Sequence, residues 1–314
     1  MFKIKKSLFG QYESINIYNA DKSTYLQIIN GFGGIVNHFQ VGNSPFSFIQ
    51  GYANAEELTT KNPFFSRSAK LFPFPNRLNQ GRYSYQGNEF QLAANFSWSE
   101  HAVHGLLYNQ PLSLVDQHAE ENFASVTLRF ETDHLDEGYP FAFALDITYR
   151  VDASGQLSFT TKVHNTGTQT MPLGDAWHPY FNLGTSLDMC ELSMSLNSAL
   201  EQIDDLPTGN KEHHDRFDVP TSLQGIVLNN CFEFDNASSN HITLSRQDGM
   251  AKVEVEMDAS YRFVQFYIPN SESTLAIEPM TCPADAFNNQ MGLIHLEPAQ
   301  QQVFTWHCTA QYLG

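Results

Sequence analysis

Apolar and polar residues alternate with a period of two through much of this chain. The clearest segments are residues 126–131, 141–151, 157–163, 253–257 and 304–312. In each segment every second side chain is mainly apolar, and the side chains between are mostly polar or small. Successive side chains of a strand point to opposite faces, so the pattern predicts half-buried antiparallel strands. We therefore expect an all-β fold.

Turn-forming sequences separate these segments, and we expect turns at Asp136–Gly138, Ala153–Gly155, Asn165–Gly167, Pro207–Asn210 and Asp248–Gly249. Helical signal is limited to a turn or two near residues 53–60. The sequence has no repeat of fixed period and no linker-like segment. Its 25 Phe and 13 Tyr residues supply large side chains for a core. We expect residues 1–314 to form a single large antiparallel β domain.

The charge balance narrows the classes of partner. With 34 acidic and 17 basic residues, the formal net charge is −17. Such a surface repels phosphate backbones and anionic lipids, so we expect neither a nucleic acid nor a membrane as a partner. A small neutral substrate is unaffected by this field, whereas a phosphorylated substrate would need a local basic pocket.

The N-terminal residues and the spacing of the cysteines indicate the cellular compartment. Residues 1–10 include basic side chains but lack the continuous apolar segment of a signal peptide. The four cysteines, Cys190, Cys231, Cys282 and Cys308, are far apart and lack metal-type spacing. We expect reduced thiols in a cytoplasmic protein.

The segment Leu173–Leu183, with the sequence LGDAWHPYFNL, contains the candidate acid His178. Gly174 and Pro179 are poor residues for a strand interior, so the segment is expected to be a loop or strand end that presents His178 to a cavity. A lone histidine is more often structural than catalytic. A functional role therefore requires partners elsewhere in the chain.

Asn76, Arg77 and Glu278 are candidate partners. Asn76 and Arg77 follow two prolines and offer donors for hydroxyls or a carboxylate, although a surface ion pair of Arg77 is the alternative. Glu278 ends an apolar strand just before a proline. Partial burial there would raise the pKa of its carboxyl and make it a better base near neutrality. The alternative is an ion pair of Glu278 with an arginine.

Two further candidates are His104 and Gln265. His104 precedes Gly105, which would allow close approach by a ligand. Gln265 lies in a predicted strand, where a side chain on the solvated face is the alternative.

Two groups of residues suggest a metal site, but weakly. His101 and His104 are three positions apart with only Glu100 nearby, and the run Glu212–Asp215 lies in a polar segment expected to be a solvated loop. Neither has a complete set of ligands at metal-type spacing, so we expect no metal site.

In order along the chain, these segments resemble the aldose 1-epimerase (galactose mutarotase) family from about Gly31 to Asn288. Each motif alone is weak, and their common order makes the resemblance specific. The motifs are Asn76-Arg77 with Gly81 and Tyr83, His104-Gly105, Trp177–Leu183, Val264–Tyr267, and Glu278 with Pro283–Asn288.

The resemblance implies a large antiparallel β-sandwich of the galactose mutarotase type with a sugar site in an open cleft. It implies that Glu278 is the base on the C1 hydroxyl, His178 is the acid at the ring oxygen and His104 assists them. Asn76, Arg77 and Gln265 would hold hydroxyls. Trp177 and Tyr180, which flank His178, are expected to be cleft walls that hold its rotamer or a platform that binds the apolar face of the sugar. No metal and no organic cofactor is needed, because Glu and His supply both proton transfers.

One position departs from the family. Asn229 stands where relatives usually have an aspartate, so sugar binding is expected to survive while the preference among hexoses is open. A second departure is the segment Ser66–Pro73, upstream of Asn76, where many relatives have a glycine-rich sequence.

Two other functions remain open at this point. The first is a hexose-6-phosphate 1-epimerase, in which Arg67, Lys70 and Arg82 would form a basic pocket near Arg77. The second is a non-catalytic carbohydrate-binding or sensing protein, which would need neither an acid nor a base. The sequence is compatible with a monomer or a homodimer.

Overall fold

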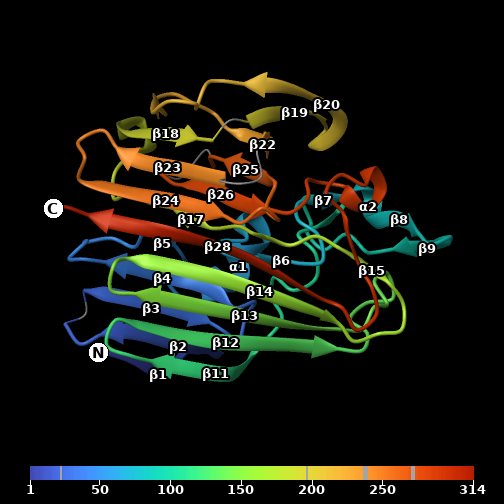
Figure 1. Cartoon of the computed structure of the whole chain (residues 1–314), viewed down its shortest axis with the longest axis horizontal. Helices are drawn as coiled ribbons and strands as arrows, with labels where there is room; N and C mark the ends of the chain where they lie inside the picture. Colours follow the sequence, from blue (N-terminus) through green and yellow to red (C-terminus); the bar gives the residue numbers. More distant parts are fainter. Residues whose placement is uncertain (22, 196, 236–239, 270–272) are drawn as a thin grey trace.

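The computed structural model describes residues 1–21, 23–195, 197–235, 240–269 and 273–314. Two large antiparallel sheets dominate these residues, one of 13 and one of nine strands. Figure 1 shows the nine-stranded sheet in front, from β11 to β18, and the larger sheet behind it. The predicted all-β sandwich is confirmed.

The larger sheet carries Tyr180, Asn229, Gln265 and Glu278 of the candidate site. Its order is β1 (Phe2–Phe9), β2 (Tyr12–Asn19), β3 (Thr24–Ile29), β4 (Ile35–Val41), β5 (Ile49–Gln50), β17 (Tyr180–Phe181), β26 (Leu275–Met280), β25 (Phe263–Tyr267), β22 (Asn229–Phe234), β19 (Asn197–Ile203) and β20 (Leu206–His214). β16 (Ala176–Trp177) pairs with β26 and with β6 (Lys70–Leu71).

The smaller sheet contains the five segments of clearest alternation. Its order is β11 (Ser113–Ala119), β12 (Phe123–Thr132), β13 (Phe143–Asp152), β14 (Gln156–Asn165), β28 (Gln301–Tyr312), β24 (Ala251–Met257), β23 (Asn240–Arg246), β18 (Cys190–Met194) and β21 (Thr221–Ser222). In β13 buried and half-buried side chains alternate without interruption, as the sequence predicts.

Shorter elements complete the described fold. Three two-stranded sheets pair β7 (Arg77–Leu78) with β10 (Ala102–Val103), β8 (Arg82–Tyr85) with β9 (Asn88–Gln91), and β15 (Met171–Leu173) with β27 (Ile294–Leu296). The helices are α1 (Ala55–Phe65), α2 (Ala286–Asn289) and the 3-10 turns η1 (Asn79–Gly81) and η2 (Leu187–Met189). Within the described ranges, no helix has the length and apolarity that crossing a membrane requires.

Aromatic residues join the two sheets. Trp177 of β16 lies 5.0 Å from the ring of Phe159 and 6.3 Å from the ring of Trp306, both of which belong to the smaller sheet. The Tyr149 hydroxyl of β13 donates to the carbonyl of Gly34 at 2.6 Å. A single hydrophobic cluster contains residues of both sheets. This shared core supports our proposal that residues 1–314 form one domain.

Two local predictions are wrong, and a third underestimates the length of a helix. Residues 207–210 and 212–214 lie in strand β20, and the turn before this strand falls at Asp204–Asp205. Pro207 and Gly209 are tolerated there because β20 is at the edge of its sheet. The helical turn near residues 53–60 is a longer helix, α1, whose cap Asn54 accepts from the N–H of Glu57.

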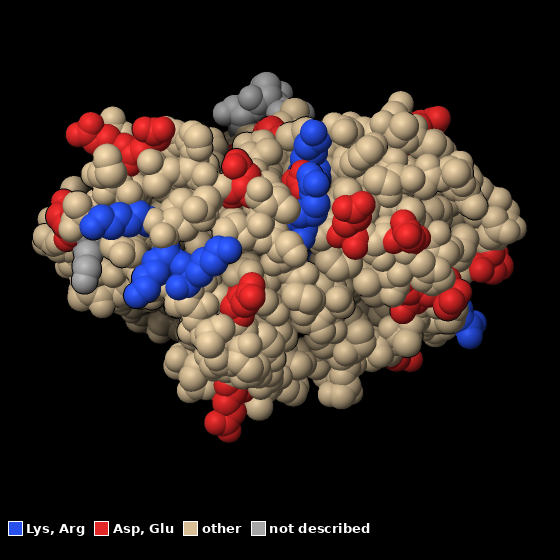
Figure 2. All heavy atoms as spheres, turned by 90° about the horizontal axis from the view of Figure 1, so that it is seen from below, with Lys and Arg blue, Asp and Glu red and all other residues tan. Residues whose placement is uncertain are grey.

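On one face of the molecule (Figure 2) the acidic side chains of the described residues are spread out and do not gather in a single patch. On the face seen in Figure 2, Lys and Arg side chains form separate groups, with Asp and Glu side chains beside them and scattered over the remainder.

A buried ion pair lies beneath β16. Lys70 Nζ contacts a carboxylate oxygen of Asp175 and donates to Thr161 Oγ1 at 2.9 Å. The other oxygen of Asp175 accepts from the Tyr261 hydroxyl at 2.7 Å. Burial lowers the pKa of Lys70 to about 8, although Asp175 opposes the shift. The pair therefore fixes the segment that leads into His178.

We predict that Lys70→Met lowers the free energy of unfolding by about 3–5 kcal/mol, because it leaves the Asp175 charge buried without its cation. Lys70→Met combined with Asp175→Asn should recover part of this loss, since an amide still accepts from Tyr261. Chemical denaturation of the three proteins checks the order of stability. A Lys70→Met protein as stable as the wild type would contradict this account.

Candidate active site

His178 and Glu278 come from strands that are neighbours in the larger sheet. His178 lies between β16 and β17, both of which pair with β26, the strand of Glu278. The N–H of His178 donates to the carbonyl of Ala69 at 3.2 Å, and its carbonyl accepts from the N–H of Ser68 at 2.8 Å. Pro179 cannot donate to a ladder, and the strand is interrupted there. His178 is thus presented at a strand end, as expected.

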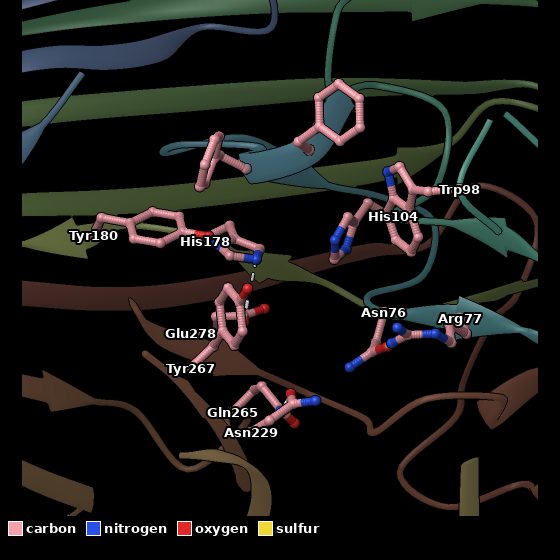
Figure 3. Close-up of a pocket in the computed structure, with 12 residues that line it drawn as sticks. Asn76, Arg77, Trp98, His104, His178, Tyr180, Asn229, Gln265, Tyr267 and Glu278 are labelled. Atoms are coloured by element: carbon pink, nitrogen blue, oxygen red, sulfur yellow. Dashed lines mark hydrogen bonds and ion pairs between the residues drawn. The ribbon is translucent and has the colours of Figure 1, made fainter. Parts of the chain in front are cut away.

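The side chains of His178 and Glu278 are in direct contact. Nε2 of His178 lies 3.2 Å from Oε1 of Glu278, and the two side chains are only 7% and 3% exposed. Figure 3 shows the contact at one wall of the cavity. Burial lowers the pKa of His178 to about 4 and raises the pKa of Glu278 well above its ordinary value. The Arg77 guanidinium opposes the second shift by lowering the pKa of Glu278. Burial therefore favours a neutral imidazole beside a neutral carboxyl, a pair that holds one titratable proton.

His104 joins this pair from another part of the chain. Its ring meets that of His178 edge-on, with centroids 5.2 Å apart. Burial, His178 and Arg77 all lower the pKa of His104, so its imidazole is neutral. Gly105 has a different role from the one expected, because a Cβ there would lie 2.2 Å from the carbonyl oxygen of Phe72. The glycine allows close approach of the protein's own backbone.

A cavity of about 300 Å³ contains this group. All eight predicted site residues line it: Asn76, Arg77, His104, His178, Tyr180, Asn229, Gln265 and Glu278. Figure 3 shows Asn229 and Gln265 together on one side, and Asn76 and Arg77 on another. Gln265 is only 3% exposed, so the alternative of a solvated strand face does not apply.

Four aromatic lining residues were missed by the sequence reasoning: Phe64, Phe65, Trp98 and Tyr267. Tyr267 lies two residues after Gln265 and so shares its strand face, a signal that could have found it. Trp98 lies in the segment before His104, and its ring contacts the Arg77 guanidinium at 5.6 Å. Trp177, by contrast, is buried between the sheets and is not a cleft wall. Tyr180 does line the cavity and stacks on His178 at 5.0 Å.

Several polar atoms of the lining side chains have no hydrogen-bond partner among the described residues. They are Nδ1 of His104, Nδ1 of His178, Oε1 of Gln265 and Oε2 of Glu278. Buried polar atoms are normally paired, so unpaired ones on the side chains that line a cavity fit a polar ligand. A sugar offers hydroxyls that donate and accept.

The basic pocket expected for a phosphorylated sugar is not formed by the residues proposed for it. Arg67 pairs with Glu57 at 3.3 Å, Lys70 pairs with Asp175, and Arg82 donates to Gln91 at 2.9 Å. None of these three lines the cavity.

The possible metal residues also lie apart from one another. Nδ1 of His101 accepts from the N–H of Gln80 at 2.9 Å, whereas His104 faces His178. In the described part of the chain, no group of three His, Cys, Asp or Glu side chains is placed to hold a metal ion.

Comparison with known proteins identifies relatives over most of the chain. The family model for aldose 1-epimerase matches residues 17–307. The uncharacterized protein YihR of Escherichia coli is 31% identical over 234 residues, which cover 72% of this chain and 73% of that protein.

Solved structures share the fold at lower identity. A galactose mutarotase-like protein from Clostridium acetobutylicum superimposes with a TM-score of 0.86 at 17% identity, covering 100% of this chain and 99% of the other. Galactose 1-epimerase from Lactobacillus acidophilus gives a TM-score of 0.82 at 15% identity, with coverage of 100% and 99%. The family match over residues 17–307 identifies this chain as a member of the aldose 1-epimerase family of isomerases.

Proposed function

We propose that this protein interconverts the α and β anomers of a free hexose, with Glu278 as the base and His178 as the acid. The observation that carries the proposal is the 3.2 Å contact between these two buried side chains in a polar cavity. Binding alone does not require such a pair. A site that opens and closes a sugar ring does, because one proton must leave the C1 hydroxyl while another reaches the ring oxygen.

The reaction proceeds through the open-chain aldehyde. Glu278 takes the proton of the C1 hydroxyl, the C1–O5 bond breaks, and His178 gives its proton to O5. The aldehyde then rotates about the C1–C2 bond. On closure His178 takes the proton back from O5, and Glu278 returns one to the carbonyl oxygen, now on the other face.

The one proton that His178 and Glu278 share is held by a different residue in each of the two stages of this cycle. With closed sugar bound, the reactive form is the Glu278 carboxylate beside a protonated His178. With the open aldehyde bound, the proton count is the same but Glu278 holds the proton. Burial favours this second, neutral form, and the Arg77 guanidinium favours the carboxylate. Burial is the larger of the two effects, so the pair rests in the neutral form, and the Arg77 guanidinium lowers the cost of reaching the carboxylate form.

The other lining residues seat the sugar in this proposal. His104, which is neutral, assists near the ring oxygen or C1. Asn76, Arg77, Asn229 and Gln265 bind hydroxyls, and Tyr180 holds the rotamer of His178 by stacking on it. Trp98 and Tyr267 offer aromatic faces to the apolar face of the ring.

We predict that Glu278→Gln lowers kcat by about 10²–10⁴-fold, because it removes the base while keeping the size of the side chain. Sugar binding, measured by calorimetry, should persist. Glu254→Gln, on β24 and outside the cavity, is the matched control and should keep wild-type turnover. An active Glu278→Gln protein would contradict the assigned base.

The pH dependence follows from the pKa shifts. Activity requires one proton on the His178–Glu278 pair. The value of kcat/KM should therefore fall at low pH, where protonation of His178, with its pKa of about 4, gives the pair a second proton. It should fall again only at a pH well above the ordinary range of glutamate, where Glu278 loses the last proton. Polarimetry from pH 4 to 9, corrected for spontaneous mutarotation, checks this plateau. An acid limb near pH 6.5, the ordinary pKa of histidine, in the wild-type profile would contradict it.

We predict that kcat/KM for glucose exceeds that for glucose 6-phosphate. The reason is that Arg77, the one Lys or Arg among the described lining residues, is already paired with Asp205 at 2.8 Å. Polarimetric assays of the two sugars under the same conditions measure both values of kcat/KM and test this order. Preferred turnover of the phosphate ester would favour the hexose-6-phosphate 1-epimerase instead.

A further inference from the structure

Asp205 reaches the candidate site from a part of the chain that motif analysis does not assign to it. It is the second residue of the two-residue turn between Ile203 of β19 and Leu206 of β20. Asp204 and Asp205 have φ angles of 51° and 62°. This left-handed conformation at both positions is that of a tight hairpin turn, which Asp and Asn tolerate. The turn thus fixes where the Asp205 carboxylate lies.

Both oxygens of that carboxylate are bound by cavity residues from different strands. Oδ2 of Asp205 lies 2.8 Å from Nη2 of Arg77, and Oδ1 accepts from Nδ2 of Asn229 at 3.2 Å. Oδ1 of Asn229 in turn accepts from Nε2 of Gln265 at 2.9 Å. On the other side, Nη1 of Arg77 donates to Oδ1 of Asn76 at 2.9 Å. Asp205 therefore joins two groups of lining residues that Figure 3 shows on separate sides of the cavity.

The chemistry of Asp205 sets the direction of this chain of hydrogen bonds. An ionised carboxylate only accepts, so Asn229 must turn its NH₂ group towards Asp205. Its oxygen then faces Gln265, which must donate. The remaining atom of Gln265 is the acceptor Oε1, which is buried beside the cavity and has no partner among the described residues.

We propose that Asp205 is a positioning residue that fixes which ends of the Asn229 and Gln265 amides donate and which accept. As a result, Gln265 offers an acceptor to one donating hydroxyl of a neutral hexose. The inference rests on the proposed function. It assigns substrate selectivity to a hairpin turn outside the cavity lining. It also explains how an amide at position 229 serves a sugar site, since Asp205 removes the ambiguity of its donor and acceptor ends.

The test compares Asp205→Asn with Asp204→Asn. Both changes remove one charge from the same turn, and asparagine tolerates the backbone at either position. Both changes introduce an amide that donates and accepts. Only at position 205 does that amide meet Asn229 and Arg77, and there it frees the orientation of Asn229 and Gln265. Anomerisation is measured for glucose and for its 2-, 3-, 4- and 6-deoxy analogues with both variants and the wild type.

We expect one deoxy analogue to lose about 10-fold or more in kcat/KM with the wild type, the effect of removing a partner from a buried acceptor. In Asp205→Asn this penalty should fall below about twofold, and KM for glucose should rise with a smaller change in kcat. Asp204→Asn should match the wild type throughout. The penalty is a ratio within each variant, so it does not depend on the fraction that is folded.

The outcomes distinguish a failure of the role assigned to Asp205 from a failure of the proposed function. Equal penalties and equal KM in the two variants, or no penalty for any analogue with the wild type, would overturn the role of Asp205 and leave the proposed function standing. A wild-type protein that anomerises none of these sugars would overturn the proposed function, and with it the inference.

Discussion

Burial of the His178–Glu278 pair is the constraint on which the rest of the site depends. Two titratable groups 3.2 Å apart, each almost closed to solvent, cannot both gain or both lose a proton without leaving a net charge buried. They therefore behave as one unit that holds one proton. In the proposed mechanism, moving that proton within the unit prepares the site for the closed or the open sugar, with no net charge entering the cavity.

The scaffold places these groups by ordinary sheet pairing. β16 lies between β6 and β26, so the segment that leads into His178 has a strand on each side. Beneath it, Lys70, Asp175 and Tyr261 satisfy one another in the interior, and Asp175 also accepts the N–H of Thr281 through its carbonyl. These buried polar contacts leave His178 little freedom to move relative to Glu278.

The strands and the residues of the cavity could be predicted from the sequence to different degrees. Alternation identified strands such as β13 and β28, because each of them buries one face against the core. The helical turns predicted near residues 53–60 gave the place of α1 but not its full length, because the helix buries only Leu58 and Asn62. Trp177 was misplaced because it is next to His178. In an extended chain neighbours point to opposite sides, so Trp177 enters the core while His178 faces the cavity.

Asp205 was beyond the reach of motif reasoning. It lies on a turn without glycine, and the nearby Pro207 and Gly209, which resemble a turn, belong to edge strand β20. Its partners Arg77 and Asn229 are distant in sequence, so only the fold brings them together.

The central claim is that the single proton of the His178–Glu278 pair drives ring opening and closure. Magnetisation-exchange NMR on C1-labelled glucose at anomeric equilibrium measures this directly, because no net reaction is needed. The account predicts α-to-β exchange that rises in proportion to the wild-type protein and returns to the spontaneous rate with His178→Gln. Exchange that is equally fast with His178→Gln would contradict it.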